Sequence, residues 1–110
     1  MDLENVNNVV SNSARHSHII AAWKLAQSSP HTLRAYSRSM TDYCSWLDGR
    51  GLDLLTVKRP IIDGYRHALV GLSPATVAAK LAALSSFYRY AVSADVITGG
   101  NPVELVKRPK

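Results

Sequence analysis

The sequence predicts an all-α protein, a small orthogonal bundle of four to five helices. Apolar residues recur at spacings of three and four along most of the chain, and Ser-Pro pairs introduce two of these apolar stretches. No segment alternates apolar and polar residues as a half-buried strand does. The chain has 110 residues, 46% hydrophobic and 19% charged, which suits one folded domain with its own core.

The N-terminal quarter of the chain divides into two parts. Residues 1–15 are rich in Asn, Ser and Val without a clean period, so we expect a flexible leader. From residue 16 to about 27, Ile19, Ile20, Trp23 and Ala26 recur at helical spacing. This pattern predicts a short amphipathic helix that packs Trp23 onto the body of the protein.

The second helix has the clearest start signal. Ser29 is suited to cap it and Pro30 to be its first residue, where the missing N–H loses no partner. Gly49 and Gly51 are expected to end it. Apolar residues at spacings of three and four place one face in the core; they are Leu33, Tyr36, Met40, Tyr43 and Leu47.

Three further segments complete the predicted bundle. After a connection over residues 52–59, a helix from about Pro60 to Gly71 has a predicted buried face of Ile61, Ile62, Tyr65, Ala68 and Leu69. Ser73 and Pro74 start a long helix to about residue 94, whose apolar side is Val77, Leu81, Leu84, Tyr88 and Ala91. Asn101 and Pro102 predict a short helix through about residue 106. We therefore expect one domain over residues 16–106, and residues 107–110 as the start of a basic linker.

The positive charge of the chain is unevenly distributed. The first 28 residues hold two acids and two cations, so the whole net charge of +5 lies after Ser28. Such an excess favours a polyanionic partner, of which nucleic acid is the commonest, although a solvated basic face is an equally ordinary explanation. On the second helix, Arg34 and Arg38 stand one turn apart on the exposed side.

Other features narrow the class of protein. Cys44 is the single cysteine, so the chain forms no internal disulfide, and we expect a reducing environment, a cytoplasmic location and no structural zinc. No apolar run approaches the roughly 20 residues that span a bilayer, so no membrane partner is expected. The histidines show no convincing metal spacing, and the tyrosines lie mostly on apolar faces. We expect no metal, no cofactor and no catalytic residue.

Two ordered series of residues resemble the core-binding domain of tyrosine recombinases, the Xer-type and phage integrases. The first runs from Ser29 to Arg38 (SPHTLRAYSR) and continues with Trp46-Leu47 and Gly51-Leu52. The second comprises GLSPATV at 71–77, LAALSSFYRYA at 81–91, Asn101-Pro102 and the terminal KRPK. The chain departs from the family pattern at Ser39, where an acid is common, and in Gly99-Gly100, where the spacing is one residue longer.

The resemblance implies an N-terminal, SAM-like arm domain that clamps duplex DNA opposite a catalytic domain of the same parent chain, beside other recombinase protomers. Its DNA contacts carry over to the starts of the second and fourth helices and to the linker. Hydroxyl groups at these helix starts are suited to hydrogen-bond phosphates. Arginine is suited to hydrogen-bond guanine, and alanine can contact only the methyl group of thymine. The implied DNA-binding residues are His31, Thr32, Arg34, Ala35, Arg38, Ala75, Thr76, Ala79, Lys80, Lys107, Arg108 and Lys110.

The resemblance also implies that this chain does not cut DNA, because the family's catalytic arginines, lysine, histidines and tyrosine belong to a C-terminal domain. Two other functions stay open. A helix-turn-helix transcription regulator needs a short turn between its helices, and the connection over residues 49–60 is too long for one. A helical protein-interaction module would use the alanine-rich face of the fourth helix as its contact surface.

Overall fold

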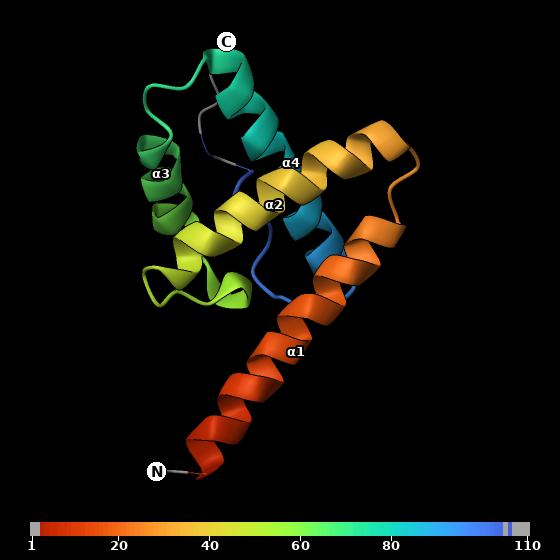
Figure 1. Ribbon diagram of the computed structural model, residues 1–110, viewed down its shortest axis with the longest axis vertical. Coiled ribbons are helices and arrows are strands. Elements are labelled where there is room, and N and C mark those ends of the chain that lie inside the picture. The colour runs from red at the N-terminus through yellow and green to blue at the C-terminus, as the bar shows by residue number, and fades with distance from the viewer. Residues whose placement is uncertain (1–2, 105, 107–110) are drawn as a thin grey trace.

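The computed structural model describes residues 3–104 and 106, with side chains from Ala14 onward. The elements are α1 (Leu3–Leu25), α2 (Pro30–Asp48), a short 3₁₀ helix η1 (Leu54–Thr56), α3 (Arg59–Ala68) and α4 (Pro74–Ser93). Over this part of the chain there are only helices, turns and loops (Figure 1). The all-α prediction is therefore confirmed.

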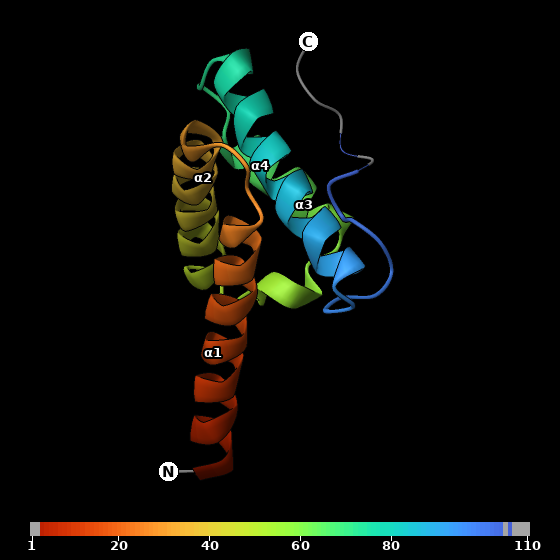
Figure 2. The same ribbon diagram turned by 90° about the vertical axis from the view of Figure 1, so that its right-hand side faces the viewer.

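The helices cross one another rather than forming a parallel bundle. α2 passes across the middle of α4, and this pair makes the largest contact between helices. α3 packs on α2, where Tyr65 meets the rings of Tyr43 and Trp46, and the C-terminal half of α1 packs on α4 (Figure 2). The N-terminal half of α1 projects away from the other helices in both views, which gives the protein extents of 48 × 30 × 24 Å.

Trp23 joins α1 to the two crossing helices, as the sequence predicts. Its buried ring stacks on Tyr36 of α2, with centroids 5.6 Å apart and planes 6° apart. The same ring meets Phe87 of α4 edge to face at 5.5 Å. Its indole N–H donates to Ser86 Oγ at 3.1 Å, so the one polar group of this large side chain is satisfied inside the core.

A chain of buried hydroxyl groups joins α2, α4 and η1. Tyr88 Oη donates its proton to the backbone carbonyl oxygen of Leu54 at 2.8 Å. Tyr43 Oη lies 2.8 Å from Tyr88 Oη. Because the Tyr88 proton is already committed to the carbonyl, Tyr43 is the donor in this second hydrogen bond. Both tyrosine side chains are fully buried, so the crossing is fixed by polar contacts as well as by packing.

The first helix corrects one expectation. It begins at Leu3, so the backbone of residues 3–15, predicted as a leader, is helical, and it ends at Leu25 rather than near residue 27. The chain has no proline or glycine before Pro30, so nothing interrupts the helix once it has formed. The asparagines and serines of this segment have low helix propensity, so the sequence did not indicate a helix there. Helix propensity is only a weak guide to the folded structure.

Two smaller expectations are also wrong. Ala68 is exposed, because α3 ends at that residue and Gly71, with φ of +98°, turns the chain away. The helix predicted over residues 102–106 is a turn over Pro102–Glu104, with Leu105 outside the described residues. There Asn101 Oδ1 accepts from the Val103 amide at 2.9 Å, which fixes a turn in place of a helix start.

Replacing each of the two hydrogen-bonded tyrosines by phenylalanine should have unequal effects. Tyr88→Phe leaves both the Leu54 carbonyl and the Tyr43 hydroxyl buried without a partner, and we expect a loss of about 3 kcal/mol in the free energy of unfolding. Tyr43→Phe removes only the outer donor and should cost about 1 kcal/mol. Urea unfolding followed by circular dichroism measures both. Equal losses would contradict the assigned order of donors.

Alkaline pH should unfold the protein. Burial is the main cause that raises the pKa of Tyr65 from 10.0 to about 12 and raises the pKa values of Tyr43 and Tyr88 as well. A raised pKa in the folded state means that the stabilisation is complete below pH 10 and is lost as pH rises above it. We therefore expect the urea midpoint to fall from pH 10 to pH 12. Tyr65→Phe should make this fall shallower, and an unchanged midpoint would contradict the prediction.

Candidate nucleic-acid interface

The start of α2 presents cations and no acids. Ser29 caps the helix by accepting the Thr32 amide on its Oγ at 3.3 Å, and the first turn contains no acidic residue. Arg34 and Arg38 are both exposed, one turn apart on the same side of the helix. This end of α2 therefore combines the positive end of a helix dipole with two exposed positive side chains.

The start of α4 has the same cap and fewer charges. Ser73 Oγ accepts the Thr76 amide at 3.2 Å and donates its own proton to Thr76 Oγ1 at 2.8 Å. Ala75 and Ala79 are exposed, and the first turn again contains no acid. Small exposed side chains allow close approach of another surface to the helix backbone.

The two helix starts face the same end of the molecule. Figures 1 and 2 both place them at the end opposite the N-terminus of α1. Most of the predicted DNA-binding residues therefore gather at this end. Those that are exposed are His31, Arg34, Ala35, Arg38, Ala75, Thr76 and Ala79, while Thr32 and Lys80 are half-buried. The other three, Lys107, Arg108 and Lys110, lie outside the described residues.

Lys80 differs from the other predicted residues because it already has a partner. Its Nζ lies 2.8 Å from Asp42 Oδ2 and donates a hydrogen bond to it. The pair joins α4 to α2 near their crossing, and the side chain of Lys80 is only 17% exposed. Asp42 has no signal in the sequence that points to Lys80, because a local pattern does not link two residues 38 positions apart.

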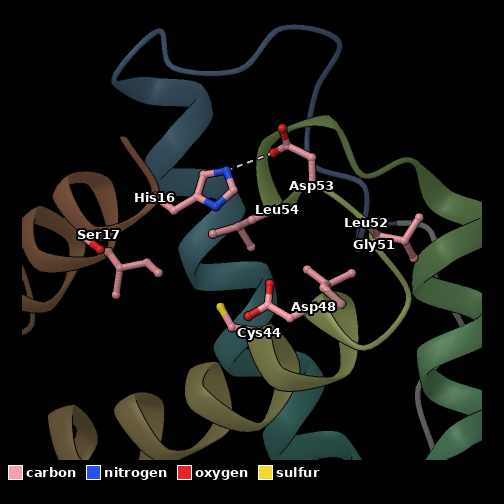
Figure 3. Close-up of a pocket in the computed structure, with 10 residues that line it drawn as sticks. His16, Ser17, Cys44, Asp48, Gly51, Leu52, Asp53 and Leu54 are labelled. Atoms are coloured by element: carbon pink, nitrogen blue, oxygen red, sulfur yellow. Dashed lines mark hydrogen bonds and ion pairs between the residues drawn. The ribbon is translucent and has the colours of Figure 1, made fainter. Parts of the chain in front are cut away.

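A separate hollow lies away from the helix starts, between α1, the C-terminal half of α2 and η1. Its volume is about 500 Å³. Figure 3 shows His16 on one wall, with Nε2 2.9 Å from Asp53 Oδ1, and Cys44 and Asp48 on another. Burial raises the pKa of the Cys44 thiol to about 11, so it carries almost no reactive thiolate at neutral pH. The His16–Asp53 contact ties α1 to the 3₁₀ turn.

The described residues give no support for a metal site, a membrane span or a nucleophile at Tyr43 or Tyr88. Within residues 3–104 and 106, no group of three or more His, Cys, Asp or Glu side chains is arranged to hold a metal ion. No helix in the same part of the chain has the length and apolar character needed to cross a membrane. Tyr43 and Tyr88 are buried and hydrogen-bonded to each other, which leaves neither hydroxyl available as a nucleophile.

Comparisons with known proteins identify the family of the chain. Residues 20–95 match the family model of the phage integrase N-terminal SAM-like domain. Tyrosine recombinase XerC of Myxococcus xanthus is 39% identical over 85 residues, which are 76% of this chain and 28% of the relative. The XerC of M. xanthus strain DK1622 gives the same values, so the chain spans little more than a quarter of the length of these curated relatives. No solved structure is significantly similar. With most of its helical core covered by the match, the chain belongs to the family of phage integrase N-terminal SAM-like domains.

Proposed function

We propose that this chain is a DNA-binding arm domain of a site-specific tyrosine recombinase, which clamps duplex DNA during DNA integration or recombination. The observation that carries the proposal is the exposure of two acid-free helix starts at one end of the molecule, with Arg34 and Arg38 exposed on the first of these helices. Family membership supports the same reading. Helix N-termini and arginines are both suited to contact phosphates.

The contacts divide by chemistry. Arg38, Thr32 and Thr76 suit the phosphate backbone, and Arg34 suits the edge of a guanine in the major groove. His31 lies beside Arg34 on the first turn of α2. Ala35, Ala75 and Ala79 offer only methyl groups, which suit the thymine methyl or close backbone approach. Arg34 is the one residue of this set that we assign to a base edge by hydrogen bonding, so the domain contributes more to affinity than to base-specific selection.

A clamp around duplex DNA requires a second domain on the other face of the duplex. We assign strand cleavage to the part of the XerC relatives that this chain does not match, and we place this chain, over residues 16–106, as the arm that holds the opposite face of the duplex. Lys107, Arg108 and Lys110 then begin a basic linker along the DNA. The partners in this arrangement are double-stranded DNA, the catalytic domain of the same parent chain and other recombinase protomers.

An amide chemical-shift titration with a short DNA duplex at low and moderate salt tests the proposal. Shifts should cluster at residues 31–38 and 75–80 and fade with salt, since phosphate binding releases counterions. Arg34→Ala should weaken binding about tenfold. Arg89→Ala removes the same charge from α4, but residue 89 lies two and a half turns beyond Lys80 and so on the opposite face, and it should change little.

The alternative outcomes separate the other functions. A folded sample that shows no shifts at low salt would overturn the DNA proposal and favour a protein-interaction module. Equal weakening by Arg34→Ala and Arg89→Ala would indicate general attraction to a basic protein instead of a defined face. A helix-turn-helix regulator is disfavoured by the connection between α2 and α3, which contains the 3₁₀ turn η1.

A further inference from the structure

The Lys80–Asp42 pair removes a positive charge from the proposed DNA-binding face. Lys80 is the one charged residue in the sequence of α4 before Arg89. Its ammonium group is bound at 2.8 Å to a carboxylate, so the pair is neutral in sum. On α2, Asp42 stands one turn beyond Arg38, at the end of the stripe that Arg34 begins. Among the described residues of this face, Arg34 and Arg38 are the Lys or Arg residues without a carboxylate partner.

The pair is unequally exposed. The Asp42 side chain is 53% exposed, whereas that of Lys80 is 17% exposed. Lys80 therefore lies along the helix crossing with its charged end directed at Asp42. If the Lys80 side chain left this contact, it would regain free rotation about several bonds and could extend outward from α4.

We propose that Asp42 withholds Lys80 from DNA, and this inference rests on the proposed function. In the free protein the ammonium of Lys80 is bound to Asp42. While this contact holds, Lys80 makes no contact with a backbone phosphate, and a bound duplex lacks that contact. Asp42 therefore lowers the affinity for DNA by the contribution of one lysine–phosphate contact.

Binding of a labelled short duplex of arbitrary sequence, followed by fluorescence anisotropy across a salt series, tests the proposal. Asp42→Asn should tighten binding about fivefold and steepen the plot of log K against log salt by about 0.9, the value for one added phosphate contact. Asp63→Asn is the matched control, because Asp63 is 51% exposed, pairs with Arg59 on α3, and loses the same charge. It should tighten binding far less and leave the slope unchanged.

A double-mutant cycle identifies Lys80 as the group released. Lys80→Ala should cost little in the wild type and should abolish the whole gain in the Asp42→Asn background. Urea midpoints of all variants establish that each one is folded. If Asp42→Asn binds no better than Asp63→Asn, or binds more weakly than the wild type, Asp42 positions Lys80 for DNA and the proposal is wrong.

A measurement without DNA separates this inference from the proposed function. Limited acetylation, quantified by mass spectrometry, should modify Lys80 several times faster in Asp42→Asn than in the wild type or in Asp63→Asn, with Lys24 and Lys58 as internal references. An unchanged rate at Lys80 would overturn the withholding contact even if the wild type binds DNA. If Lys80 is acetylated faster in Asp42→Asn but the domain fails to bind DNA, the proposed function is wrong, and so is a contact of released Lys80 with phosphate.

Discussion

The hydroxyl of Tyr88 is the constraint on which the arrangement of the helices depends. It is fully buried, and it donates its proton to the Leu54 carbonyl while it accepts a hydrogen bond from Tyr43. Moving α2 along α4, or η1 away from either, would leave buried polar groups unsatisfied. Packing of apolar side chains alone tolerates such a shift more readily, because dispersion contacts have little directional preference. The relative placement of the two exposed helix starts therefore follows from a contact in the core.

Elements with local signals could be predicted from the sequence. Ser29 and Ser73 cap their helices as expected, since a cap depends only on the residue and the three that follow it. The buried positions Met40, Tyr43 and Leu47 follow from helical spacing for the same reason. The start of α1 was missed because residues 3–15 carry no periodic apolar pattern, although they contain no residue that would break a helix.

Contacts between distant residues could not be predicted in this way. The Lys80–Asp42 and His16–Asp53 pairs join residues 38 and 37 positions apart, and each depends on how two elements cross. Their effect is nevertheless large for the interpretation of the surface. Counting cations in the sequence makes Lys80 equal to Arg34, whereas the structure gives one of them a carboxylate partner and leaves the other exposed. A net charge therefore overstates the attraction that a basic face can exert on a polyanion.

The turn at Asn101 has a mechanical consequence. Its side-chain amide donates to the carbonyl and to Oγ of Ser85, at 3.0 and 3.1 Å, and Val103 and Val106 are buried just beyond it. The chain is thus fastened to the middle of α4 after that helix has ended. If α4 rotates, the turn at Asn101 moves with it, because the turn is bonded to the helix directly and not only through the intervening loop. Val103 and Val106 would therefore follow any tilt of that helix.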